Sequence, residues 1–164
     1  MGNENPYATP DSNVEVPGTS ELAGRGARLG AAIIDGLIMA AIVLPIFFLT
    51  GFWEKSMSGQ QTIGESFMMA GFGIVSFALL NFYLLAKHGQ TIGKRLVNIR
   101  IVSVDDGRIL SFGKVISLRY LPIWVVQQIP LIGPILGLVD PLFIFRSDRR
   151  CVHDLIAGTR VVNA

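Results

Sequence analysis

The chain has 164 residues, of which 51% are hydrophobic and 16% are charged, and its mean hydropathy is +0.51. This composition is too apolar for an ordinary soluble domain, and the length excludes more than one compact unit. The formal net charge of +2 gives no reason to expect a nucleic-acid partner. We therefore expect a small polytopic membrane protein.

The first segment, residues 1–21, contains acidic side chains and three prolines but no aliphatic run. Such a segment cannot bury enough apolar surface to order itself. We predict a disordered, acidic and proline-rich tail, followed by a membrane domain over residues 22–164. The tail has no basic stretch leading into a short apolar core, so a removable signal peptide is not expected.

Two apolar runs follow the tail, over residues 29–52 and 67–86. Each reaches the ~20 residues that an α-helix needs to cross a bilayer. We predict that both are full transmembrane helices. Together they define the fold class as an all-α integral membrane protein.

The third apolar run is interrupted by Pro130, Gly133 and Pro134, which break a helix. We predict a helical hairpin with one leg over residues 112–128 and a shorter returning leg over residues 135–145. The legs form either a third and a short fourth span or a re-entrant loop, and the sequence leaves both alternatives open.

Basic residues set the predicted orientation. The loop after the first span carries only Lys55, whereas residues 87–119 and 146–164 are rich in lysine and arginine. Basic loops stay in the cytoplasm. We predict an integral protein of a bacterial inner (plasma) membrane with both termini cytoplasmic.

A short region between the spans has the period of a β-strand. Val97, Ile99 and Ile101 alternate with polar residues, and an Asp-Asp-Gly turn follows. Residues 108–110 could return as a second strand, and residues 159–163 are also rich in β-branched side chains. We predict a small cytoplasmic β-hairpin or sheet over about 96–110 and 159–163.

Polar side chains share one depth in the predicted spans. Arg28 and Asp35 lie two turns apart on one helical face, and Asp35, Asn81 and Asp140 each lie about 9 to 10 Å inside a basic edge. Two close carboxylates raise one another's pKa, and Asn81 offers an oxygen ligand, so this layer could bind a cation or a proton. The alternative is a structural network in which Arg28 neutralises one aspartate.

The other candidate motifs do not predict a catalytic or metal-binding site. Residues 89–95 have the wrong spacing for a phosphate-binding loop, and Cys151 has no second cysteine. His153 and Asp154 are adjacent in sequence with no third metal-binding group nearby. We predict no metal, no cofactor and no enzymatic activity, and we expect hydrogen bonding across the loop from His153 to Thr159.

The motifs together resemble the RDD family of small membrane proteins. The resemblance covers about residues 22–163 and rests on four segments: Arg28–Asp35, Gly89–Arg95, Leu138–Asp140 and His153–Thr159. The family is named for one arginine and two aspartates. Arg28 and Asp35 match the first two, while Asp140 and Asp154 both fit the third.

The resemblance implies residue roles and an activity. The matching motif residues are Arg28, Asp35, Gly89, Gly93, His153 and Asp154. Transport of an unidentified ligand has been proposed for family members, and cation/proton antiport has been reported for some. These properties are expectations for this chain.

Two functional hypotheses follow. The first is a transporter, expected to be a homo-oligomer in the lipid bilayer, that exchanges a monovalent cation for protons. In it Asp35 and Asp140 alternate between proton and cation, Arg28 sets their pKa and Asn81 supplies an oxygen ligand. The second is a non-transporting scaffold or assembly factor in which these residues are structural. The deciding question is whether Asp35 meets water or Arg28.

Overall fold

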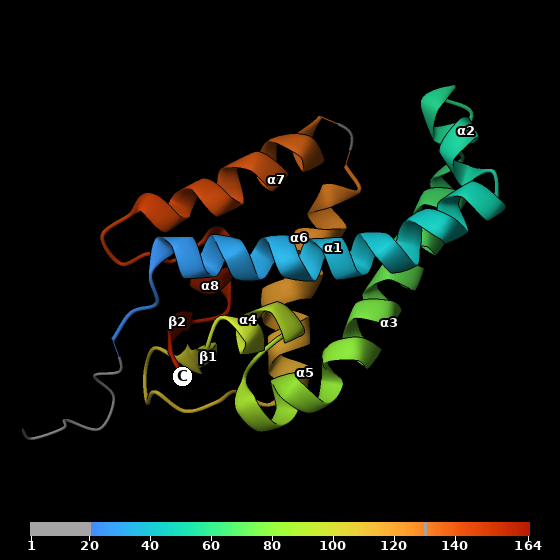
Figure 1. The fold of residues 1–164 in the computed structure, drawn as a ribbon. Helices are drawn as coiled ribbons and strands as arrows, with labels where there is room; N and C mark the ends of the chain where they lie inside the picture. Colours follow the sequence, from blue (N-terminus) through green and yellow to red (C-terminus); the bar gives the residue numbers. More distant parts are fainter. Residues whose placement is uncertain (1–20, 130) are drawn as a thin grey trace, which may run out of the picture.

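The computed structural model describes residues 21–129 and 131–164, and the predicted tail therefore lies almost entirely outside the described residues (Figure 1). The described chain is mostly helical, with two long apolar helices and a small two-stranded antiparallel sheet. The strands and the short helices α4 and α8 gather near the beginning of α1, away from α2 (Figure 1). This polar end holds most of the candidate site residues.

The long helices are α1 (Arg25–Leu49) and α3 (Ile63–His88), joined through α2 (Phe52–Met57). Both are long and apolar enough to cross a membrane, by length and composition. The helix α3 begins at a capping box in which Thr62 and Glu65 each accept a backbone N–H of the other. The prediction of two long apolar helices is confirmed.

The third apolar region breaks and reverses near Pro130, as its sequence predicts. The first leg consists of α5 (Phe112–Lys114), the π-helix η1 (Val115–Tyr120) and α6 (Leu121–Gln127). The returning leg is α7 (Ile132–Leu142), extended by the 3₁₀ helix η2 (Phe143–Phe145).

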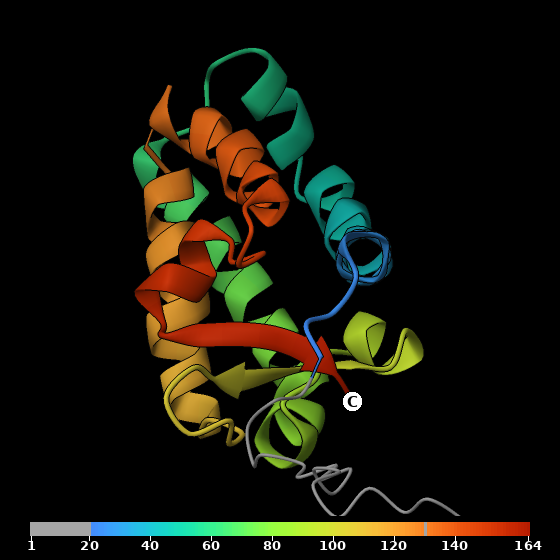
Figure 2. The same cartoon turned by 90° about the vertical axis from the view of Figure 1, so that its left-hand side faces the viewer.

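The turn between the two legs is tight because Gly133 lies against α6. A β-carbon on Gly133 would lie 2.2 Å from the carbonyl oxygen of Gln127. The returning leg then runs beside α1 (Figures 1 and 2). This arrangement brings the end of α7 close to the beginning of α1.

The sheet pairs two segments that are far apart in the sequence. The strand β1 (Ile99–Ser103) pairs antiparallel with β2 (Thr159–Asn163), with Ile101 opposite Val161. Leu22 adds an isolated bridge to Val162. The predicted return strand at residues 108–110 is therefore wrong.

The reason for this difference is burial. Val161 and Val162 of β2 are almost completely buried beside β1, at 1% and 0% exposure. Residues 108 and 109, by contrast, are exposed after a turn in which the Ser103 N–H donates to the Arg108 carbonyl, and Leu110 is only partly buried. Burial of apolar area favours the distant partner over the local one.

A compact apolar core joins the sheet to the helices. Its buried members come from α1, α3, β1, β2, η1 and the segment before α1, and they are Ala23, Ala31, Phe77, Leu85, Ile99, Ile101, Val115 and Val161. The short helices α4 (Ile92–Leu96) and α8 (Val152–Ile156) flank the sheet (Figure 2). Each presents polar groups to the beginning of α1.

Candidate functional site

Asp154 is the centre of a buried ion-pair network. It lies on α8 with 0% exposure, and it pairs with Arg28 of α1 and with Arg119 of η1, whose Nη1 lies 2.6 Å from Oδ1. The Thr159 hydroxyl donates to Oδ1 at 3.0 Å, and the Cys151 N–H donates to Oδ2 at 3.1 Å. One carboxylate thus connects α1, η1, α8 and β2.

The charges around Asp154 keep it ionised. Burial alone would raise the pKa of this carboxyl, but the positive charge of Arg119 and then that of Arg28 outweigh burial and hold the pKa well below its ordinary value. The expected hydrogen bonding across the loop from His153 is present as the Thr159–Asp154 bond. Asp154 is therefore the aspartate that pairs with Arg28.

Arg28 does not meet Asp35, which was one of the two outcomes that the sequence left open, and it pairs with Asp154 instead. Besides Asp154, the Arg28 guanidinium donates to the carbonyl of Arg149. Side chains on an α-helix lean toward its N-terminus, so the long Arg28 side chain reaches away from Asp35 toward α8. A shared helical face did not bring the two charges together.

Asp35 instead holds the short helix α4 against α1. Its Oδ1 accepts the Gly93 N–H at 2.7 Å, and its Oδ2 accepts the Thr91 hydroxyl and lies 4.0 Å from the Lys94 ammonium. A β-carbon on Gly93 would lie 2.2 Å from the carbonyl oxygen of Ala31. Glycine is therefore required at Gly93 for this close approach.

Asn81 supports the same turn from α3. Its side-chain oxygen accepts the Ile92 N–H at 2.9 Å, and its amide donates to the Phe77 carbonyl at 3.0 Å. Gly89 adopts a left-handed φ of 64°, and a β-carbon there would lie 2.5 Å from the Ile101 carbonyl. The motif from Gly89 onward is thus a structural turn held by α1 and α3.

Asp140 forms a different contact from the one predicted. It binds His153, with its Oδ2 2.7 Å from Nδ1 and its Oδ1 accepting the His153 N–H at 3.0 Å. The Nε2 of His153 lies 3.1 Å from Nη2 of Arg119, which can only donate. His153 therefore donates through Nδ1 to Asp140 and is neutral. Burial and then the Arg119 charge lower its pKa in agreement with this state.

The predicted polar layer is therefore divided into two groups. Asp35 and Asn81 both hold α4, whereas Arg28 and Asp140 belong to the contacts around Asp154 and His153. No described contact joins Asp35 to Asp140. All four residues make polar contacts, but the structure does not bring them together into the single ion site that was predicted.

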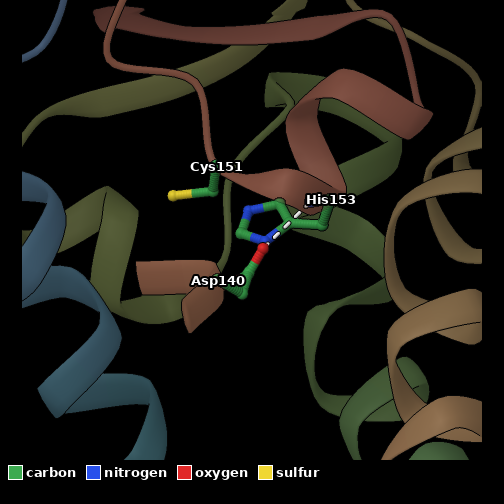
Figure 3. Close-up of side chains that lie close together, drawn as sticks. All are labelled: Asp140, Cys151 and His153. Carbon is green, nitrogen blue, oxygen red and sulfur yellow. Dashed lines mark hydrogen bonds and ion pairs between the residues drawn. The ribbon is translucent and has the colours of Figure 1, made fainter. Parts of the chain in front are cut away.

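Three possible metal ligands lie close together, contrary to the prediction that His153 has no such neighbours. The ligand atoms of Asp140, Cys151 and His153 lie within 4.8 Å of one another. Figure 3 shows Asp140 directed at the His153 ring, whereas the Cys151 sulfur points away from that pair.

The surroundings of these three residues disfavour a metal cation. Burial raises the pKa of the Cys151 thiol to about 11, and Arg28 Nη2 lies 3.6 Å from its sulfur. Arg119 occupies the free nitrogen of His153. A divalent cation would meet a neutral thiol and two guanidinium groups, so we assign the cluster to the Asp154 network.

Arg119 is the site residue that the sequence analysis missed. The side chain is 2% exposed and bonds Asp154, Thr159 and His153. Its place at the beginning of an apolar leg is typical of an arginine that reaches the lipid headgroups. In the structure it lies within the π-helix η1, and its side chain contacts Asp154 of α8 and Thr159 of β2 instead.

Two cavities lie beside these groups. Asp35 lines a cavity of 350 Å³ between α1, α3 and the first leg, together with Met39, Phe77, Tyr120, Trp124 and Gln128 among others. Asp140, Arg28, Arg119 and His153 line a separate cavity of 590 Å³ between α1 and the returning leg. The two carboxylates predicted to share a site thus face different spaces.

The fold and the polar network define a small helical membrane protein. The chain belongs to the RDD family, whose model matches residues 22–158. It is similar to the uncharacterized protein YckC of Bacillus subtilis, with 34% identity over 87% of this chain and 85% of that protein. It is also 30% identical to an uncharacterized protein of Haemophilus influenzae over 55% of each chain. No solved structure matches the chain.

Proposed function

We propose that the protein exchanges a monovalent cation for protons, with Asp35 taking up each in turn. The observation that carries the proposal is the position of Asp35. Its carboxylate lies on a helix able to cross a membrane and lines the 350 Å³ cavity, and its partners among the described residues are Gly93, Thr91 and Lys94 rather than an arginine. An intramembrane carboxylate beside a cavity is expensive to keep and is a functional candidate by default.

The surrounding groups fit an exchange of counter-ions. Gly93 and Thr91 fix the carboxylate with two hydrogen bonds, while the Lys94 ammonium is 4.0 Å away, beyond a direct hydrogen bond. A monovalent cation or a proton arriving from the cavity would replace Lys94 as the partner of Asp35. In this scheme Lys94 takes the role predicted for Arg28, and Asp140 has no part in the exchange.

Proteoliposomes test this proposal. The purified protein is reconstituted with a pH-sensitive dye inside, and sodium or potassium is added outside. We expect cation-driven proton flux in the parent and none in Asp35→Asn, while Glu54→Gln, a change in the exposed α2, keeps the parental rate. Parental flux in a folded Asp35→Asn protein would overturn the mechanism.

The second candidate is a non-transporting scaffold, favoured by the Asp154 network. Arg28 and Arg119 are both buried, and each pairs with the buried Asp154. Such pairing is expected of residues whose role is to hold helices together. A parent protein without cation-driven flux, together with a lower folded yield of Asp35→Asn, would select this candidate. An enzymatic role is no part of either proposal.

We also propose an inner-membrane location with both termini cytoplasmic. The support is that β1, β2, α4 and α8, with their basic residues, gather at one end of the helices (Figure 1). Labelling by a membrane-impermeant thiol reagent tests it in a Cys151→Ser background. We expect Ser56→Cys to react from outside the cell and Ser103→Cys to react only after permeabilisation. Chemical crosslinking in the membrane tests the expected homo-oligomer.

A further inference from the structure

The larger cavity of 590 Å³ combines positive charge with an apolar wall. It lies between the first turns of α1 and the end of the returning leg, where α8 and Lys94 of α4 also contribute. Its cationic members are Arg25, Arg28, Lys94 and Arg119, and Asp140 is its single carboxylate. The cavity is separate from the space beside Asp35, and the cation exchange proposed above shares only Lys94 with it.

Part of this positive charge has no internal counter-ion. Asp154 accounts for Arg28 and Arg119, but Arg25 donates only to the carbonyls of Ile144, at 3.2 Å, and Phe145, at 3.4 Å. Among residues 21–129 and 131–164, Arg25 has no carboxylate partner. The Nε of Arg119, although buried, also has no hydrogen-bond partner in that part of the chain.

The apolar wall continues onto the outer surface of both helices. Leu29 of α1 is 57% exposed, Leu142 of α7 is 59% exposed and Phe145 of η2 is 67% exposed, and all three line the cavity. On a membrane protein such side chains contact acyl chains. The cavity therefore offers cations at its polar end and a surface for hydrocarbon beside them.

We infer that this cavity binds one anionic phospholipid, with its phosphate held by Arg25 and Lys94 and an acyl chain along Leu29, Leu142 and Phe145. Basic pockets between helices at the cytoplasmic side of a membrane bind anionic headgroups. A small inorganic anion would leave the apolar wall unused. A zwitterionic lipid would bring its own cation to a cavity that is already positive.

Binding of defined lipids to the full chain in detergent tests the inference. Native mass spectrometry measures the affinity for phosphatidylglycerol, for phosphatidylcholine and for glycerol phosphate. We expect retention of one phosphatidylglycerol, with at least tenfold weaker binding of the other two. Equally tight binding of phosphatidylcholine would show that the cavity does not select an anionic lipid and would overturn the inference. Equally tight binding of glycerol phosphate would show that the ligand is a soluble anion and not a lipid.

Variants distinguish lipid binding in this cavity from general attraction of anionic lipids to the basic protein surface. Arg25→Gln should weaken phosphatidylglycerol binding about fivefold, the value of one basic side chain near a membrane surface, and Arg25→Lys should restore most of it. The matched control is Arg108→Gln, whose side chain is 86% exposed and lies outside the cavity. A loss in Arg108→Gln equal to that in Arg25→Gln would overturn the site.

A second variant tests the apolar half. Ala32→Phe adds bulk to the cavity wall without changing charge and should also weaken binding of phosphatidylglycerol. Unchanged binding in both Ala32→Phe and Arg25→Gln would place the lipid elsewhere. The two proposals can fail separately: Asp35 does not line this cavity and its loss frees Lys94, so Asp35→Asn is expected to lose flux but to bind phosphatidylglycerol at least as tightly as the parent.

Discussion

Two ionisable side chains on the same helix have opposite surroundings. Arg28 is enclosed at the first turn of α1 and is neutralised by Asp154 in a buried network that also holds Arg119. Asp35, two turns further on, is held by a backbone amide and a hydroxyl and borders a cavity. Arg28 connects distant parts of the chain through an ion pair, whereas the Asp35 carboxylate can still accept a further partner.

This contrast separates a structural role for Arg28 from a ligand-binding role for Asp35, two roles that the sequence did not distinguish. A fully paired buried charge changes state only at a large cost in free energy, so Arg28 and Asp154 suit a permanent connection. A carboxylate with neutral donors and a distant ammonium can exchange its partner at a smaller cost. The following variants test whether the two regions really differ in this way.

The largest expected effect comes from removing the charge of Asp154. Asp154→Asn leaves Arg28 and Arg119 buried without a counter-ion, so we expect a loss of about 3–5 kcal/mol in the free energy of unfolding. Thermal unfolding in detergent and folded yield measure it. Asp106→Asn, in an exposed turn, serves as the control and should unfold like the parent. An Asp154→Asn protein as stable as the parent would show that the network does not stabilise the fold.

Gly93→Ala should have the next largest effect. The added methyl would meet the Ala31 carbonyl oxygen and the Asp35 carboxyl carbon, at 2.2 and 2.9 Å, and so would force α4 away from α1. We expect a loss of about 1–3 kcal/mol, in the range for an overpacked site. Gly30→Ala, which meets nothing within 4 Å, is the control. Equal unfolding temperatures for both variants would contradict the close contact.

Asp35→Asn should cost less stability than either change. The remaining amide oxygen can still accept the Gly93 N–H, so we expect a loss of about 1 kcal/mol. The variant should therefore be folded, which makes its flux interpretable. The contrast between the two regions fails if Asp35→Asn destabilises the protein as strongly as Asp154→Asn, measured by the same unfolding experiment.

The smallest effect concerns pH. The pKa of His153 is lowered in the folded protein, so the unfolded chain takes up a proton first as pH falls below about 6.5. Stability should therefore be full above that pH and fall between about pH 6.5 and the lower folded pKa. His153→Gln should remove this slope, whereas His88→Gln should retain it. The measurement is the unfolding temperature from pH 7 to 5. If its dependence on pH is unchanged in His153→Gln, this histidine is not the group that titrates.

Local sequence patterns predicted much of the fold. Apolar length identified both long helices, Pro130 and Gly133 marked the reversal, and alternation located β1. The partner of β1 was not predictable by the same means, because residues 108–110 and 159–163 both have β-forming side chains. Which of them pairs depends on the burial of Val161 and Val162 against distant helices.

The site was predicted in its residues but not in its pairings. Spacing along a helix gives the depth of Asp35 or Asn81, but it does not say which neighbouring element each side chain meets. Arg28 and Asp35 share a face, yet side-chain direction sends one to α8 and the other to α4. Arg119 was missed for a related reason, because its partners lie on α8 and β2 and the local pattern around it does not show that they meet.

The separation in sequence between Arg28 and Asp154 has a consequence for biosynthesis. The two residues are 126 positions apart, so the ribosome makes the arginine long before its acceptor. Until α8 has been made, the Arg28 guanidinium therefore lacks the carboxylate that neutralises it in the folded protein. Release of an incomplete chain that lacks residues 152–164 would leave Arg28 and Arg119 without their acceptor. Such a chain should be recognised by membrane quality-control proteases even though its long helices are intact.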